Sequence, residues 1–133
     1  DPNIKTKKFT KTSLKKLIQV SDVISIHAHV SKQTKYMLNK KILKLAKKNP
    51  IILNTSRGEI VKEDDIIWGL KNRLISGYGT DVIETEFLDI KKSPIIKNLN
   101  KYNIIVTPHI GGMTYQGQLR AWNFAVEKFK KNK

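Results

Sequence analysis

Four short runs rich in apolar, β-branched residues recur along this chain, and segments with a helical pattern lie between them. The runs cover residues 23–26, 51–53, 75–81 and 104–106, and the helical segments cover 13–20, 39–48 and 63–73. Near-continuous apolar strands that alternate with amphipathic helices are typical of a parallel sheet. The sequence therefore predicts an α/β domain of right-handed β-α-β units, with helices covering both faces of the sheet.

The helical segments carry suitable ends. Asn39 suits the N-cap of the second segment, and the acidic residues 63–65 suit the first turn of the third, whose last turn is basic. A final helix over about residues 114–131 is predicted from five apolar residues spaced by four and three: Tyr115, Leu119, Trp122, Val126 and Phe129. We expect its apolar stripe to pack against the body of the domain.

The chain holds 26 Lys and Arg against 11 Asp and Glu, a formal net charge of +15, which raises nucleic acid as a partner. All but three of the basic residues are lysines, spread along the chain with few aromatic residues among them. Arginine forks and stacking rings, which read nucleic acids, are therefore scarce. A solvated lysine-rich surface is the preferred interpretation, and a nucleic-acid site stays open as the alternative.

Composition also limits the class of protein. There is no cysteine, and no apolar run approaches the roughly 20 residues that a membrane span needs. These features predict a soluble, cytoplasmic protein without a membrane segment. The sequence begins at Asp1 without an initiating methionine, so we expect it to be part of a longer chain. Residues 1–133 contain no linker or repeat and are interpreted as one unit.

Ligands of open parallel sheets bind beyond the carboxyl ends of the strands, so the residues after each run are the candidates for function. The four candidate segments are His27-Ala28-His29, Thr55-Ser56-Arg57-Gly58, Asp81 to Glu86, and Thr107 to Gly112. Each has a simpler interpretation alone. Arg57 could lie in a solvated turn to which Gly58 supplies an unusual φ, and His109 could be a loop histidine bound by backbone. Glu84 and Glu86 could belong to a polar loop.

Arg57, Glu86 and His109 together are harder to explain as turns, because about one strand-helix unit separates each from the next. An arginine fork binds a carboxylate or carbonyl group through charge-assisted hydrogen bonds. A carboxylate beside a histidine favours the imidazolium and keeps it a competent acid at neutral pH. None of these groups carries a hydride, so oxidoreduction would need a redox cofactor.

Several motifs resemble, in order and spacing, the D-isomer-specific 2-hydroxyacid dehydrogenases, and the match covers essentially the whole chain. They are Ser21-Asp22-Val23-Ile24-Ser25-Ile26-His27 with Thr34 downstream, Asn54 to Val61, the helix from Glu63 to Leu70, Ile75 to Val82, Glu84-Thr85-Glu86, and Thr107 to Gly112. The resemblance implies a Rossmann-type doubly wound parallel sheet, NAD as cofactor, and oxidoreduction between D-2-hydroxy acids and 2-oxoacids.

The resemblance also implies a role for each matching residue. Arg57 would bind the substrate carboxylate and carbonyl, His109 would be the acid/base, and Glu86 would pair with His109. Asp81 would contact the nicotinamide carboxamide, and Asp1 would hold the adenosine ribose, which favours NAD over NADP. The remaining residues that would line the nicotinamide half of the site are His27, Ala28, Thr55, Ser56, Gly111 and Gly112.

Some residues depart from the family pattern. Phe87 stands where the family has proline, His29 stands where proline is common, and Lys62 replaces an acidic residue. Glu84 could compete with Glu86 for the histidine, although Glu86 fits the register better. His27 and His29 could suggest a metal pair, but no third ligand follows at a suitable spacing, so no metal site is predicted.

No Gly-x-Gly-x-x-Gly turn, the usual pyrophosphate site, occurs in the sequence. We therefore expect a C-terminal portion of a dinucleotide-binding domain that lacks the first β-α-β unit and is inactive alone. The resemblance further implies a homodimer at full length and a separate substrate domain, on which the last helix could instead dock. An NAD-binding regulatory or corepressor-like protein of the same fold, without turnover, remains the alternative.

Overall fold

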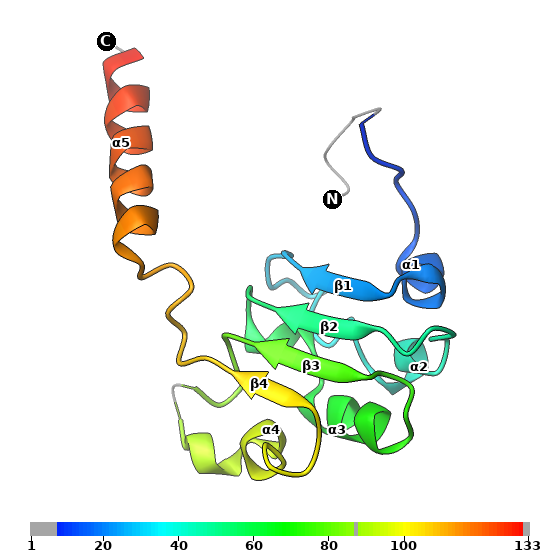
Figure 1. Cartoon of the computed structure of the whole chain (residues 1–133). Helices are drawn as coiled ribbons and strands as arrows, with labels where there is room; N and C mark the ends of the chain where they lie inside the picture. Colours follow the sequence, from blue (N-terminus) through cyan, green and yellow to red (C-terminus); the bar gives the residue numbers. More distant parts are fainter. Residues whose placement is uncertain (1–7, 87, 132–133) are drawn as a thin grey trace.

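The structure, a computed structural model, describes residues 8–86 and 88–131. Within them the strands are β1 (Val23–Ile26), β2 (Ile51–Asn54), β3 (Gly77–Thr80) and β4 (Ile104–Val106), which form one parallel sheet in the order β1-β2-β3-β4 (Figure 1). The predicted α/β class with a parallel sheet is confirmed, and each strand lies within two residues of its predicted ends.

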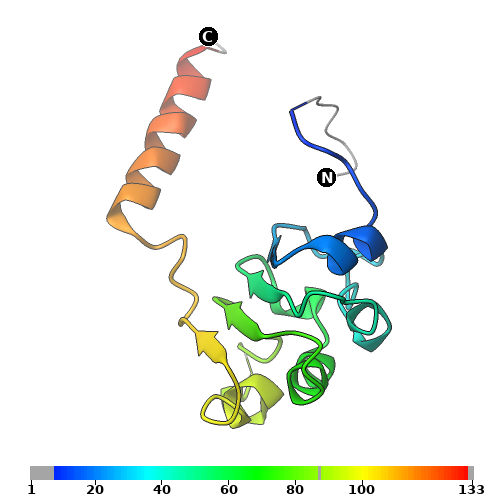
Figure 2. The same cartoon turned by 45° about the vertical axis from the view of Figure 1, so that its right-hand side comes forward.

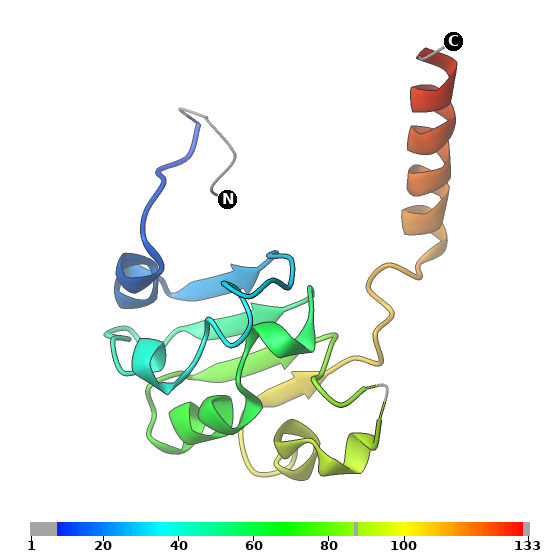
Figure 3. The same cartoon turned by 180° about the vertical axis from the view of Figure 1, so that it is seen from behind.

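The helices that precede β1 and that connect the strands gather on one face of the sheet, as the view from behind shows (Figure 3). They are α1 (Leu14–Val20), α2 (Lys40–Leu43), α3 (Glu63–Lys71) and α4 (Pro94–Lys97), with short 3-10 turns η1 (Gly58–Ile60) and η2 (Ile90–Lys92). The core lies between this layer and the sheet, where Ile18, Leu43, Ile52 and Ile66 are fully buried.

The opposite face of the sheet is not covered by the described residues, so the expectation of helices on both faces is wrong for this part of the chain. Val23 is 56% exposed although Ile24 beside it in β1 is buried, and Ile105 is 66% exposed between the half-buried Ile104 and Val106. Right-handed crossovers that proceed in one direction along a sheet place every helix on the same side. Units that ran in the other direction from β1 would place their helices on the second face.

The register of the sheet brings the strand ends into line. Ile26 pairs with Asn54, Asn54 with Thr80, and Thr80 with Val106. The residues that follow this row are His27, Thr55, Asp81 and Thr107, so the four candidate loops begin side by side at one edge of the sheet.

Helix α2 is shorter than the predicted segment 39–48. Asn39 caps its start as expected, and its side chain accepts from the N–H groups of Lys41 and Ile42. After Leu43 the chain tightens, because Leu45 N–H binds Ile42 O at 2.9 Å and Ala46 N–H binds Leu43 O at 3.0 Å. These contacts span three residues and so replace the four-residue pattern of an α-helix.

Helix α5 (Tyr115–Lys131) forms where the apolar spacing predicts it, but it does not pack against the body. It has no buried residue; Trp122 is 72% exposed, and Figures 1 and 2 show the helix standing apart from the sheet. A periodic stripe shows that a helix has an apolar face and leaves open which surface covers that face. None of the helices in the described ranges is long and apolar enough to cross a membrane.

Candidate active site

The loops after β1 and β2 are joined by a side chain. Ser56 Oγ donates to the carbonyl of Ala28 at 3.1 Å, which ties the two loops together at the sheet edge. His27 is exposed beside them, and its Nε2 lies 2.8 Å from Ser25 Oγ. His27, Ala28 and Ser56, all predicted to line the nicotinamide half of a cofactor site, therefore border one surface.

The backbone around Arg57 is held by Asn54, the last residue of β2. Asn54 is fully buried, and its amide donates to Arg57 O at 2.9 Å and accepts from Ser56 N–H at 3.2 Å. The guanidinium of Arg57 is exposed and makes one hydrogen bond within the described residues, from Nη1 to Ser56 O at 2.7 Å. Its remaining donors are available to a ligand.

Gly58 is required for a different reason from the one the sequence suggests. No glycine in the described residues has a positive φ, so Gly58 does not supply an unusual backbone angle. A Cβ at this position would instead lie 2.2 Å from Ile83 C and 2.3 Å from Glu84 N. The Arg57 loop is therefore pressed directly on the backbone of the acidic loop that follows β3.

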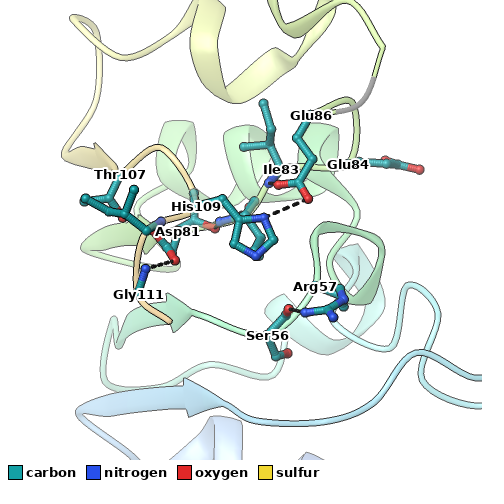
Figure 4. Close-up of polar contacts among 12 residues, drawn as sticks. Ser56, Arg57, Asp81, Ile83, Glu84, Glu86, Thr107, His109 and Gly111 are labelled. Atoms are coloured by element: carbon teal, nitrogen blue, oxygen red, sulfur yellow. Dashed lines mark hydrogen bonds and ion pairs between the residues drawn. The ribbon is translucent and has the colours of Figure 1, made fainter. Parts of the chain in front are cut away.

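Glu86 and His109 form the contact that the resemblance implies. His109 Nδ1 lies 3.0 Å from Glu86 Oε1, and the two side chains are 44% and 16% exposed, respectively (Figure 4). A carboxylate that is ionised only accepts hydrogen bonds, so a hydrogen bond here requires the proton to lie on Nδ1. Nε2 makes no hydrogen bond to the residues that the structure describes.

Glu84, the competing carboxylate, is occupied elsewhere. The Tyr36 hydroxyl donates to Glu84 Oε1. This hydrogen bond, with burial and the nearby negative charge, raises the pKa of Tyr36 to about 12. The structure therefore separates two carboxylates that lie two positions apart in sequence.

The backbone of His109 is in the left-handed region, with φ of 54°. Such angles are uncommon outside glycine and persist where the surroundings hold them. Asp81 provides that hold, because its carboxylate accepts from Thr107 Oγ1 at 2.5 Å, Ile110 N–H at 3.0 Å and Gly111 N–H at 2.8 Å (Figure 4). One carboxylate thus binds the chain on both sides of the histidine.

These contacts set the protonation state of Asp81. Burial acts to raise its pKa, but the hydrogen bonds from Thr107, Gly111 and Ile110 and the charge of His109 outweigh burial and hold the pKa below 3.8. A Cβ at Gly111 would lie 2.8 Å from Asp81 Oδ2, so a larger residue there would displace the carboxylate. Gly112 has open space where a Cβ would stand.

The remaining predicted residues divide into two groups. Thr55 begins the loop after β2 and is exposed at the sheet edge. Asp1 and Phe87 lie outside the described residues, so the predicted ribose contact has no geometry here. Among the residues that the structure describes, no group of three or more His, Cys, Asp or Glu could hold a metal ion.

Sequence reasoning missed several residues that position this site. Asn54 and Thr107 were treated only as parts of motifs, and Tyr36 was not considered. A polar residue at the end of an apolar run was the available signal for Asn54, because a buried amide must find partners. Nothing in the local sequence links Tyr36 to Glu84, which lie 48 positions apart.

A sequence profile described as "D-isomer specific 2-hydroxyacid dehydrogenase, NAD binding domain" matches residues 1–111. The chain belongs to this family. The predicted resemblance and the Rossmann-type fold are thereby confirmed, and NAD is the cofactor of the matched domain. The match ends before α5.

Individual relatives agree with the family assignment. A glyoxylate reductase of Thermococcus litoralis is 38% identical over 102 residues, which cover 77% of this chain and 29% of the relative. D-lactate dehydrogenase from Aquifex aeolicus, solved with NAD and lactic acid, is 32% identical with a TM-score of 0.75, over 90% of this chain and 39% of that one.

A third relative covers almost the whole chain. An acyclic imino acid reductase, solved with NADPH and D-Arg, is 25% identical with a TM-score of 0.81, over 99% of this chain and 41% of that one. The chain therefore spans well under half the length of each of the three relatives.

The described residues fit the nicotinamide end of NAD. A carboxylate offers about four acceptor positions, of which Asp81 uses three, so one remains for a carboxamide N–H. Gly77 and Gly79 do not form a pyrophosphate site, because both lie inside β3 and a Cβ at Gly79 would meet Leu53 at 2.8 Å. These glycines serve strand packing and do not form a phosphate loop.

Proposed function

We propose that this chain is the catalytic part of the NAD-binding domain of an NAD-dependent oxidoreductase that interconverts D-2-hydroxy acids and 2-oxoacids. The observation that carries the proposal is the 3.0 Å contact between Glu86 and His109 at the sheet edge where the Arg57 loop also lies. Family membership and relatives named glyoxylate reductase and D-lactate dehydrogenase support the substrate class.

His109 is the proton donor and acceptor in this proposal. Its Nδ1 is engaged by Glu86, so Nε2 faces the reacting oxygen and delivers a proton to the carbonyl during reduction. Glu86 stabilises the imidazolium before that transfer, and in oxidation the same atom removes the hydroxyl proton. The bound nicotinamide would supply or accept the hydride.

Arg57 is the substrate anchor. Its guanidinium is exposed and offers a planar fork that matches a carboxylate, and a second N–H can polarise the adjacent carbonyl. Asp81 would hold the carboxamide and keep the His109 loop in place, while Ser56 and Ala28 would border the nicotinamide ring. Thr55, His27, Gly111 and Gly112 complete the proposed lining.

The test measures NADH oxidation by the complete protein with glyoxylate and with pyruvate. We expect turnover in the wild type and its loss, by roughly 10²- to 10⁴-fold in kcat/KM, in His109→Gln and in Arg57→Ala. Undiminished turnover in both variants would remove the assigned roles. Absence of turnover with a range of 2-oxoacids, together with NAD-dependent oligomerisation, would instead support a regulatory or corepressor-like protein.

The isolated 133-residue chain should behave differently. Because no glycine-rich pyrophosphate turn occurs in its sequence, we expect weak NADH binding and no hydride transfer by this chain alone. Titration of NADH fluorescence tests this expectation, and micromolar binding would contradict it.

The partners of the complete protein are also part of the proposal. We expect a cytoplasmic homodimer that does not bind nucleic acid, with the exposed apolar stripe of α5 docked on a substrate domain. Analytical ultracentrifugation tests the dimer, and protection of Trp122 from a fluorescence quencher tests the docking. Strongly salt-dependent retention on DNA would contradict the expected absence of nucleic-acid binding.

A further inference from the structure

Glu63, the first residue of α3, is 3% exposed, although charged residues are rarely buried without a partner. No salt bridge joins it to a lysine or arginine in the described part of the chain. Its partners are two neutral donors: Ser93 Oγ donates to Oε2 at 2.6 Å, and Glu84 N–H donates to Oε1 at 2.8 Å. Burial raises its pKa, and these hydrogen bonds act in the opposite direction.

The second of these donors belongs to the acidic loop of the candidate site. The N–H of Ile83, one residue earlier, lies 3.4 Å from Glu86 Oε2. Gly58 presses on the same stretch from the Arg57 side, since its missing Cβ would lie 2.2 Å from Ile83 C. The Ile83–Glu84 backbone is therefore fixed from two directions, and the Glu86 carboxylate rests on it.

We propose that Glu63 is a positioning residue for Glu86. By accepting a hydrogen bond from Glu84 N–H, it holds the acidic loop in the position where the Glu86 carboxylate contacts His109 Nδ1. The proposal rests on the proposed function, in which Glu86 and His109 are the proton-transfer pair. Glu63 itself is buried beneath the loop and is not a catalytic residue.

A purely structural role is the competing explanation. Through Ser93 the same carboxylate also joins α3 to the start of α4, where Ser93 caps the helix by accepting from Ile95 N–H at 3.1 Å. If this link were the whole role of Glu63, its loss would lower stability without changing the surroundings of His109. Ser93→Ala provides the matched control, because it breaks the link to α4 and leaves the contact with Glu84.

The test uses nuclear magnetic resonance on the 133-residue chain, so it does not depend on turnover. The ring ¹⁵N signals of His109 report its contact with Glu86, and Glu86→Gln gives the reference change. We expect Glu63→Asp, whose carboxylate is retracted by one methylene group, to change these signals in the same direction. Hydrogen exchange at the Glu84 amide should become about tenfold faster, the equivalent of one lost hydrogen bond.

Glu63→Gln should leave the His109 signals as in the wild type, because its side-chain amide can accept a hydrogen bond from Glu84 N–H and donate one to Ser93. Ser93→Ala should lower stability and leave the His109 signals unchanged. Glu63→Met can make neither of these two hydrogen bonds, so it should show the largest change in the His109 signals if it folds. If it does not fold, Glu63→Asp carries the test. Unchanged His109 signals in Glu63→Asp, with faster exchange at Glu84, would overturn the positioning role.

The two proposals fail in different ways. If Glu86→Gln leaves the His109 signals unchanged, the Glu86–His109 contact is absent in solution and the positioning role falls with it. If the signals follow Glu63 as expected but the complete protein turns over no 2-oxoacid, only the proposed reaction is overturned.

Discussion

The two halves of the candidate site are held with very different rigidity. His109 is bound through its ring to Glu86 and through its flanking backbone to Asp81. The backbone of Arg57 is held by Asn54, but its guanidinium is exposed and makes one hydrogen bond within the described residues, to the carbonyl of Ser56. His109, the proposed proton donor, is therefore held by hydrogen bonds to both its ring and its flanking backbone, whereas the side chain of Arg57, the proposed anchor, keeps most of its donors for a ligand.

This difference suits the role that we propose for each group. A proton donor acts through one atom and loses efficiency when its ring rotates, so fixed hydrogen bonds serve it. An arginine that binds a carboxylate keeps its donors free in the absence of that ligand, because internal acceptors would compete with it. The predictions below test the contrast between the fixed histidine and the free arginine.

The largest effects are expected in the steady-state kinetics of variants of His109 and Arg57. In the complete protein, His109→Gln should lower kcat by roughly 10²- to 10⁴-fold with a small change in KM for the 2-oxoacid. Arg57→Lys should act mainly by raising that KM, since an ammonium cannot present a planar fork. Steady-state kinetics with NADH distinguish these outcomes, and equal effects on kcat and KM in both variants would remove the contrast.

Two glycines test how tightly the loops are packed. Gly58→Ala should lower the free energy of unfolding by about 1–3 kcal/mol, because its Cβ would meet the Ile83–Glu84 backbone. Gly112→Ala is the control, with open space for the added carbon and an expected change within about 0.5 kcal/mol. Urea unfolding measures both, and similar values for the two variants would contradict the close contact.

Asp81→Asn should loosen the histidine side and show a pH dependence. At neutral pH we expect Asp81→Asn to lower the free energy of unfolding by about 1–3 kcal/mol, because the N–H of the new amide would face a backbone N–H. Because the pKa of Asp81 is lowered on folding, its carboxylate contributes stability fully above pH 3.8. That stability is lost as the pH falls through the lower pKa of the folded state. The difference in urea midpoint between wild type and Asp81→Asn should therefore narrow as the pH falls below 3.8. A difference that stays constant with pH would contradict the ionised carboxylate.

The smallest effect is expected at Tyr36. Tyr36→Phe removes the hydrogen bond to Glu84 and should cost about 0.5–1.5 kcal/mol. In a wild-type-minus-variant ultraviolet titration, the Tyr36 phenol should ionise with a pKa of about 12. Ionisation at the ordinary value of 10.0 would show that Glu84 is free and able to compete for His109.

Much of the fold was predictable because its signals are local. The β-branched runs predicted the four strands, and Asn39 and residues 63–65 predicted the starts of two helices. The order and spacing of the motifs indicated the family. The length of α2 was not predictable in the same way, because the chain tightens after Leu43 within a lysine-rich stretch that still has a helical pattern.

The candidate site divides along the same line. Motif register placed Arg57, Glu86 and His109 after successive strands, and the parallel sheet brings those loops to one edge. The choice of Glu86 over Glu84 as the contact of His109 was expected from register, but the hydroxyl that occupies Glu84 comes from Tyr36, far away in the chain. Long-range contacts of this kind leave no local pattern to read.

The sequence by itself determined the alternation of strands and helices, the family and the residue types at the strand ends, because each depends on neighbours close in the chain. Only the tertiary structure decided which sheet face is covered, that α5 stands apart, and why Gly58 is a glycine. It also showed that Glu63 is buried beneath the acidic loop. These features depend on which surfaces meet in space, and a glycine or a buried acid has no local signature of the atoms that press against it.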